Sequence, residues 1–196
     1  GIATGNLRPW ERWRLIEKAT MAYGYGVSTS LLQIAHAYTT LARDGDMVSL
    51  SLIRDEKPRK SLQVFSKETA RNVRQMLEET AGPNGSKIQA MVEGYRIGGK
   101  SGTARKIVNG RYSRRDYRGS FVALAPISNP RVVVAVTVDN PRKAGYFGTL
   151  IAGPAAGEII GGTLKYLSVP PDLNTGPTLE AKNTKTQSGS NRNTRG

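Results

Sequence analysis

Lys100-Ser101-Gly102-Thr103-Ala104-Arg105 is the stretch of this sequence that indicates a fold most directly. It places a lysine, two hydroxyl residues and a glycine in one short segment, which reads as a strand that runs on toward a turn. Together with the residues from Gly94 onward, it also completes the phosphate-binding pattern G-x-x-x-x-G-K-[ST]. That pattern requires a helix directly after the serine, and the residues after Ser101 favour a strand. Nucleotide binding is therefore the weaker of the alternatives that the segment leaves open.

The composition predicts one domain with a basic surface. The 196 residues, 38% of them hydrophobic, are enough for a single core and a tail. A formal net charge of +14 indicates an anionic partner, with nucleic acid as one alternative, or simply a solvated basic surface. With no cysteine and one histidine, His36, disulfide scaffolds and thiolate metal sites are excluded. We expect no metal and no cofactor.

The chain divides into a structured body, residues 1–167, and a polar tail, residues 168–196. The tail is rich in proline, glycine, asparagine, lysine and serine, and it has too little apolar surface to offset its ordering entropy. We therefore expect it to be disordered. No apolar run approaches the roughly 20 residues that cross a bilayer, so any membrane anchor is expected upstream of residue 1.

Periodicity predicts the order helix, strand, helix, three strands, helix. The first helix has candidate caps at 28–30 and a stop at Gly45. The predicted helices cover 31–42, 66–81 and 153–167, and the predicted strands cover 48–53, 95–105, 120–126 and 131–139. Such an order favours an α+β fold in which an antiparallel sheet is covered by helices.

The Lys100 segment also matches part of a known catalytic pattern. Lys-Thr-Gly is one signature of serine enzymes that react with penicillin, together with Ser-x-x-Lys and Ser-Asp-Asn motifs. Ser101 replaces the threonine here and keeps the hydroxyl. No serine of the chain has lysine three residues later, and none has asparagine or aspartate two residues later. The chain therefore carries part of an active site without its nucleophile.

Five features in sequence order carry a resemblance to a known family. They are Tyr23-Gly24-Tyr25-Gly26, the helix after it, Lys100 to Lys106, Asn109-Gly110-Arg111-Tyr112 and Gly145-Tyr146-Phe147-Gly148. Together they resemble the C-terminal portion of the transpeptidase domain of class B penicillin-binding proteins, the division-specific penicillin-binding protein 3 type. The resemblance implies a serine β-lactamase/transpeptidase-like fold. It also implies a peptidoglycan D,D-transpeptidase that cross-links stem peptides in septal wall synthesis through a serine acyl-enzyme and is inhibited by β-lactams.

The same resemblance implies roles for particular residues. Lys100 would place positive charge beside the nucleophile, and the hydroxyls of Ser101 and Thr103 would bind the terminal carboxylate of the substrate. The backbone N–H of Thr103 would be one of two oxyanion-hole donors. The other residues expected to contact substrate or a β-lactam are Gly102, Arg105, Tyr25, Tyr112, Tyr146 and Phe147.

The partners implied are the upstream half of the same domain, peptidoglycan stem peptides, β-lactam antibiotics and division-machinery proteins. The implied location is the periplasmic face of the bacterial inner membrane, with the anchor in an upstream transmembrane helix. An apolar sheet edge and helix face should be open where the upstream half docks. A basic nucleic-acid-binding module remains the alternative. No recognised nucleic-acid-binding helix motif accompanies its densest basic patch, 96–118, and we expect no nucleic acid.

Overall fold

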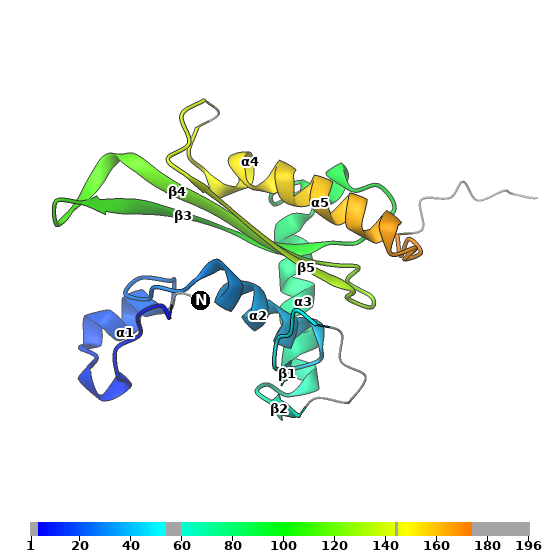
Figure 1. Ribbon diagram of the computed structural model, residues 1–196, viewed down its shortest axis with the longest axis horizontal. Helices are drawn as coiled ribbons and strands as arrows, with labels where there is room; N and C mark the ends of the chain where they lie inside the picture. Colours follow the sequence, from blue (N-terminus) through cyan, green and yellow to red (C-terminus); the bar gives the residue numbers. More distant parts are fainter. Residues whose placement is uncertain (1–3, 54–59, 144, 174–196) are drawn as a thin grey trace, which may run out of the picture.

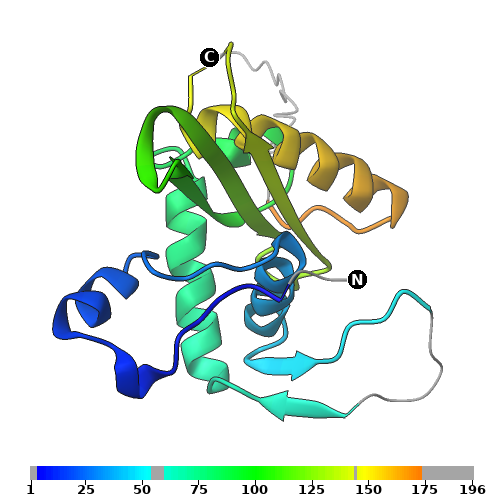
Figure 2. The ribbon, with the colours of Figure 1, turned by 60° about the vertical axis from the view of Figure 1, so that its left-hand side comes forward.

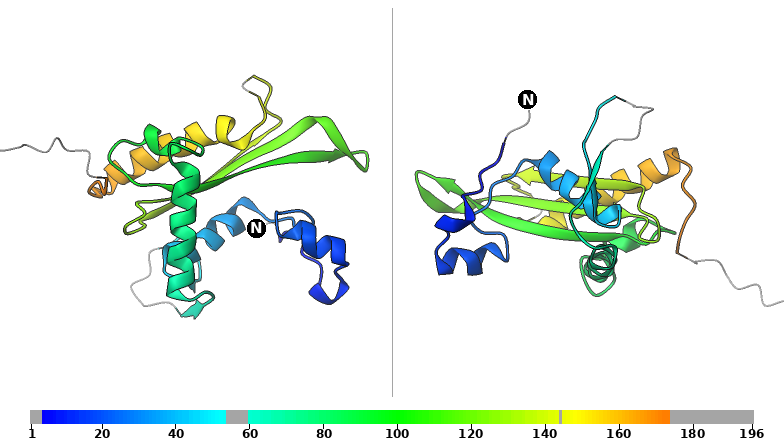
Figure 3. Two further views of the ribbon diagram at one scale, coloured as in Figure 1. Left: turned by 180° about the vertical axis from the view of Figure 1, so that it is seen from behind. Right: turned by 90° about the horizontal axis from the view of Figure 1, so that it is seen from below.

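The computed structural model describes residues 4–53, 60–143 and 145–173, and its centre is a three-stranded antiparallel sheet (Figure 1). The strand order is β3-β4-β5. The helices α4 and α5 cover one face, and α2 and α3 lie on the other, as the views from behind and below also show (Figure 3). The predicted α+β class, an antiparallel sheet covered by helices, is confirmed.

The sheet strands are β3 (Gly98–Val108), β4 (Arg111–Ala125) and β5 (Val132–Asp139). A two-residue turn joins β3 to β4, with positive φ at Asn109 and Gly110, and asparagine with glycine is the preferred pair for such a hairpin. The predicted strand 120–126 is too short, because β4 begins at Arg111. The first half of β4 is polar and shows no alternation of apolar and polar residues. It is a strand because it pairs with β3, and not because one of its faces is buried.

The three long helices lie where the sequence predicts them: α2 (Leu31–Ala42), α3 (Lys67–Ala81) and α5 (Gly153–Tyr166). The hydroxyl of Ser30 accepts from the N–H of Gln33 at 3.2 Å, and the Gln33 side chain accepts from the N–H of Ser30 at 2.8 Å. This capping box explains the sharp start of α2. Two apolar residues of these helices, Met76 of α3 and Ile159 of α5, are exposed.

The core is divided between the two faces of the sheet. On the α5 face, Phe121 and Ala123 of β4 pack with Ile160 and Leu164 of α5. On the other face, the smaller cluster is Leu77, Leu124 and Ile127, and residues of α2 pack against it. Each burial removes apolar area from water, so β4, which contributes to both clusters, is the central element of the fold.

A second, two-stranded sheet lies beside α2. It pairs β1 (Asp46–Val48) with β2 (Ser61–Gln63). The predicted strand 48–53 is therefore wrong in position. After Val48 the chain turns, because the Ser51 hydroxyl bonds the backbone N–H and C=O of Ile53 and competes with strand pairing.

The N-terminal arm, residues 4–30, projects from the rest of the chain (Figure 2). It contains the short helices η1 (Trp10–Arg12) and α1 (Leu15–Met21). Its large apolar side chains are mostly exposed, including Trp10, Leu15 and Tyr23. A surface of this kind is typical of a region that packs on another polypeptide.

The C-terminal segment packs against the body beyond residue 167, where the sequence predicts that the structured part ends. Val169 is buried, and the Asp172 carboxylate accepts from the backbone N–H groups of Arg96 and Ser128. The remainder of the predicted tail, 174–196, lies outside the described residues. Hydrogen bonds that Asp172 accepts from residues more than 40 positions away decide this boundary, and no local pattern encodes them. Among the described residues, no helix combines the length and apolarity needed to span a membrane.

Candidate active site

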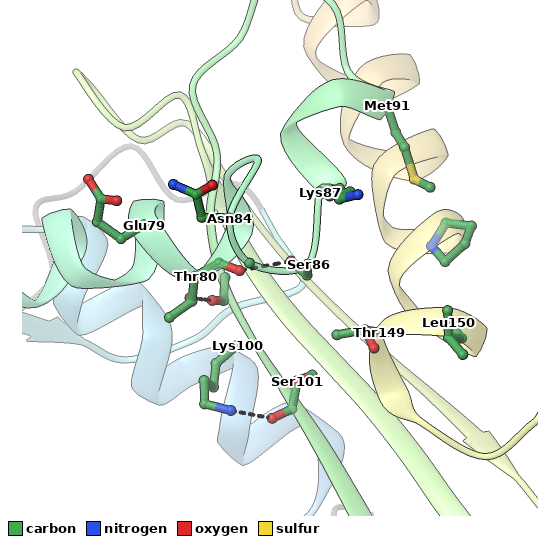
Figure 4. Close-up of a pocket in the computed structure, with 13 residues that line it drawn as sticks. Glu79, Thr80, Asn84, Ser86, Lys87, Met91, Lys100, Ser101, Thr149 and Leu150 are labelled. Atoms are coloured by element: carbon green, nitrogen blue, oxygen red, sulfur yellow. Dashed lines mark hydrogen bonds between the residues drawn. The ribbon is translucent and has the colours of Figure 1, made fainter.

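A pocket of about 790 Å³ opens along the outer edge of β3 (Figure 4). Its floor is the start of β3. The loop after α3, together with the short helix η2 (Ile88–Met91), forms one wall, and α4 (Gly148–Ile151) with the start of α5 forms the other. The polar lining residues include Thr80, Asn84, Ser86, Lys87, Lys100 and Ser101, and the apolar ones Met91, Leu150 and Pro154.

The backbone of β3 presents alternate residues to this pocket. The C=O of Gly99 accepts from the Thr80 hydroxyl, and the C=O of Ser101 accepts from Nζ of Lys100 at 2.8 Å (Figure 4). In a strand, the N–H and C=O of one residue point to the same side, and this side alternates along the chain. Since β4 occupies the inner side, the backbone groups of residues 99, 101 and 103 point outward. The N–H of Thr103 therefore faces the open edge.

The side chain of Thr103 connects β3 to α4. Its Oγ1 accepts from the backbone N–H of Gly148 at 3.1 Å, at the first residue of α4. A Cβ on Gly148 would lie 2.4 Å from the C=O of Ser120 and 2.5 Å from that of Gly102. Only glycine lets the backbone approach the strands this closely. Because the Thr103 oxygen accepts from Gly148, its own proton remains available to a ligand.

An aromatic group lies beside this strand, and the sequence predicted only part of it. The ring of Tyr117 stacks on that of Tyr146, with centroids 4.1 Å apart, and Phe147 follows at 4.5 Å from Tyr146. Arg105 is the residue of β3 directly opposite Tyr117 of β4, and its guanidinium lies 5.9 Å from the centroid of the Tyr117 ring. Arg105, Tyr146 and Phe147 were predicted site residues, and the structure brings Arg105 and Tyr146 against Tyr117, with Phe147 against Tyr146.

Sequence reasoning missed Tyr117. Its position opposite Arg105 depends on the strand register, because β4 uses five steps from Tyr112 to Tyr117 where β3 uses two from Ile107 to Arg105. Counting residues from the hairpin turn gives the wrong partner. The signal that could have indicated Tyr117 is its position shortly before Gly119, where the buried part of β4 begins.

Two predicted site residues lie apart from the others. Tyr112 is near the tip of the hairpin, opposite Ile107, and it is exposed. Tyr25 belongs to the N-terminal arm, where its ring contacts that of Tyr23 edge-on at 5.6 Å. Their contact with a ligand therefore remains a prediction that the geometry of this chain does not support directly.

Two ionised carboxylates, Asp139 and Asp116, link the β3–β4 hairpin to the end of β5 and to the segment after it. Asp139 accepts from Lys106 at 2.7 Å and from Arg118 at 3.1 Å, and these contacts, that of Lys106 foremost, lower the pKa of Asp139. Asp116 accepts from the Ser113 hydroxyl and from Arg142, which lower its pKa in that order. Both carboxylates stay charged at neutral pH, so Arg142 is held against the hairpin.

The weaker alternatives can be tested against this geometry. The phosphate-binding pattern is wrong, because Ser101 continues into β3 and is not followed by the helix that the pattern requires. Among the described residues, no group of three histidine, cysteine, aspartate or glutamate side chains could hold a metal ion. His36 bonds the C=O of Val48 at 2.7 Å, a contact between α2 and β1.

The family of penicillin-binding protein transpeptidase domains matches residues 1–161 of this chain. The chain belongs to this family. The transpeptidase chain is 44% identical over 171 residues to the probable peptidoglycan D,D-transpeptidase PenA of Neisseria gonorrhoeae, covering 87% of the chain and 29% of that protein. It is 36% identical over 168 residues to the peptidoglycan D,D-transpeptidase FtsI of Escherichia coli, covering 85% of the chain and 28% of that protein.

Solved structures agree with the sequence relatives. The transpeptidase domain of penicillin-binding protein 3 from Burkholderia pseudomallei superposes with a TM-score of 0.79 at 51% identity, covering 86% of this chain and 52% of that one. The predicted family and fold are thereby confirmed. The chain spans less than a third of the length of these two curated relatives and about half of the solved domain.

Proposed function

We propose that this chain supplies the Lys-Ser-Gly half of the active site of a peptidoglycan D,D-transpeptidase. The observation that supports it best is the open edge of β3. This edge combines the Lys100 ammonium, the hydroxyls of Ser101 and Thr103 and an outward backbone N–H beside a pocket. No serine of the chain stands in a nucleophile motif. We infer that the nucleophile belongs to the upstream half of the domain.

The reaction assigns a task to each of these groups. A serine attacks the carbonyl between two terminal D-alanines, the last D-alanine leaves, and the acyl group passes to an amine of a neighbouring stem peptide. The Ser101 and Thr103 hydroxyls donate to the terminal carboxylate of the donor peptide. The N–H of Thr103 stabilises the oxyanion of the tetrahedral intermediate, and one such donor contributes about 3 kcal/mol to transition-state stabilisation.

Lys100 contributes charge and hydrogen bonds. One of its three donors is used by the C=O of Ser101 at 2.8 Å, and two remain for groups of the upstream half. A positive charge beside the serine lowers the cost of forming its alkoxide. In this proposal Lys100 touches the reacting groups, whereas Gly102 allows the strand to pass close to the ligand, since its Cβ position has no heavy atom of this chain within 4 Å.

β-Lactams inhibit the enzyme in this proposal by acylating the same serine, with their carboxylate in the place of the D-alanine carboxylate. Arg105, Tyr146 and Phe147 form one wall for ligand side chains, and Tyr117 supports that wall through its ring contacts. Tyr112 and Tyr25 remain candidates for outer contacts.

The upstream half is also the partner that suits the exposed apolar side chains of the N-terminal arm. The similarity to FtsI of Escherichia coli supports a role in septal wall synthesis and contact with division-machinery proteins. In that role the protein acts at the periplasmic face of the inner membrane, with the anchor in an upstream segment.

Fluorescent-penicillin labelling tests the proposal. The full-length protein is labelled, cleaved once upstream of Gly1 at an introduced protease site, and separated on a denaturing gel. We expect label on the upstream fragment and none on the fragment of this chain. Label on this chain would mean that one of its own serines is the nucleophile. An unlabelled full-length protein would refute the proposed activity.

A further inference from the structure

The β3–β4 hairpin continues well past the site. We call residues 104–118 the hairpin arm, and Figure 1 shows it extending beyond the helices that cover the sheet. The arm contains six basic residues and one acidic residue, Asp116. The basic residues are Arg105, Lys106, Arg111, Arg114, Arg115 and Arg118.

Among the described residues, the ion pairs of the arm leave four of these six charges without a carboxylate. Asp139 is shared by Lys106 and Arg118, and Asp116 is bound by Arg142. Of these four, Arg105 lies over the Tyr117 ring, and the other three are exposed arginines for which the described part of the chain offers no carboxylate partner. They are Arg111, Arg114 and Arg115.

Local backbone structure explains why the arm displays these arginines outward. Between Tyr112 and Tyr117, four residues of β4 lie opposite the single residue Lys106 of β3. The Ser113 hydroxyl accepts from the N–H groups of Arg115 and Asp116 and donates to the Asp116 carboxylate. This bulge turns Asp116 toward Arg142 and leaves Arg114 and Arg115 in solvent.

The arm is continuous with the proposed site. Arg105 follows Thr103 by two residues on the same strand and packs over Tyr117. Further out, Ile107 and Tyr112 form an exposed cross-strand pair, next to Arg111. A basic track with one exposed aromatic ring therefore leads from the carboxylate-binding strand to the tip of the hairpin.

We propose that the hairpin arm binds carboxylates of the polymeric substrate away from the reacting peptide end. The partner is an acidic peptide chain carried in many copies by a glycan polymer, and this inference rests on the proposed function. Guanidinium groups pair with carboxylates in bidentate geometry, and unpaired arginines offer all their donors for this purpose. The exposed ring of Tyr112 offers an apolar face to the same chain. Binding of remote substrate parts lowers the KM of a polymer.

The test uses the full-length enzyme and two triple variants with the same loss of charge. The arm variant is Arg111→Gln/Arg114→Gln/Arg115→Gln. The control variant, Lys67→Gln/Arg131→Gln/Lys165→Gln, removes three exposed charges on α3, the β5 side and α5. Each protein is assayed for cross-linking of soluble, un-cross-linked peptidoglycan strands and for acylation by fluorescent penicillin.

We expect the arm variant to raise the KM for the strands about tenfold at low salt, with kcat little changed. The increase should shrink at high ionic strength, since the contacts are exposed. Penicillin acylation should stay within about twofold of the wild type and so show that the variant is folded. Arg→Lys replacements at the same three positions should recover only part of the affinity, since lysine keeps the charge and lacks the bidentate guanidinium.

Three results would overturn the inference. One is an unchanged KM for the strands in an arm variant that penicillin acylates normally. A second is an equal rise of KM in the control variant, which would indicate net charge rather than the arm. The third is arginine-dependent binding to duplex DNA or to anionic vesicles without any effect on the strands. Failure of penicillin to acylate the wild type would instead refute the proposed function.

Discussion

The two edges of the central sheet have opposite chemistry. The β3 edge is built from glycine, lysine, serine and threonine, and two of its outward carbonyls are bound by side chains of this chain. The β5 edge, Val132–Asp139, has the sequence VVVAVTVD. Helices α2 and α5 pack against β5, but no strand in the described part of the chain pairs with its outer side.

This difference indicates different partners for the two edges. A polar edge with its carbonyls already bound resists pairing with another strand and can instead hold a short ligand. An apolar strand with unpaired N–H and C=O groups is a template for a further strand. We therefore expect the substrate at β3 and a strand of the upstream half at β5.

The largest expected effect concerns the polar edge. Lys100→Ala in the full-length protein should reduce acylation by penicillin about 10²- to 10⁴-fold, because the charge beside the serine is lost. The rate constant for fluorescent-penicillin labelling measures this. The matched control is Lys87→Asn, which removes the other lysine of the same pocket at a residue whose φ of 59° asparagine tolerates. Equal losses in both variants would show that pocket charge, and not the strand position, matters.

The next effect concerns the contact between β3 and α4. Gly148→Ala places a Cβ 2.4 Å from the C=O of Ser120, so α4 must move and the Thr103 bond must lengthen. We expect a loss of about 1–3 kcal/mol in unfolding free energy, with slower acylation. Urea unfolding with the labelling assay gives both values. The control is Gly162→Ala, whose added Cβ meets no atom within 4 Å and which should be neutral or slightly stabilising. An equal loss of unfolding free energy and acylation rate in Gly162→Ala would contradict a specific role for the contact between β3 and α4.

The apolar edge can be tested by hydrogen exchange. In this chain alone, the outward amides of β5 should exchange at least about tenfold faster than those of the central β4 strand. Addition of the upstream half should slow them to the β4 rate. Successive N–H groups of a strand point to opposite sides, so the exchange rate of only every second amide of β5 should fall when the upstream half is added. Uniformly slow exchange in the isolated chain would contradict an open edge.

The smallest effect lies away from both edges, between α2 and α3. Hydrogen bonds from Arg74 and then Arg71 lower the pKa of Asp44, at 2.6 and 3.0 Å. With a folded pKa below the unfolded one, this contribution to stability is complete above the unfolded value, near 4, and is lost as the pH falls through the folded pKa. The unfolding free energy of the full-length protein should therefore include a small loss on acidification that Asp44→Asn lacks. Parallel pH profiles for the two proteins would exclude this role, and neither edge should respond to the substitution.

The sequence predicted helices better than strands. Ser30 and Ser66 cap α2 and α3 by bonds to residues three positions away, so these starts are encoded locally. The first half of β4 is a strand only because it pairs with β3, and its bulge at Ser113 shifts the register. The strand limits and the place of Tyr117 therefore could not be counted from the sequence.

The sequence by itself determined the family, the α+β class and the Lys100–Thr103 strand, and it showed that no serine of this chain stands in a nucleophile motif. Those features depend on residue type and short spacing. Tertiary structure alone decided that Thr103 bonds Gly148, that Arg105 and Tyr146 meet at Tyr117, and that Arg111, Arg114 and Arg115 find no carboxylate in the described part of the chain. These contacts join residues up to 45 positions apart, and strand register and close backbone approach create them.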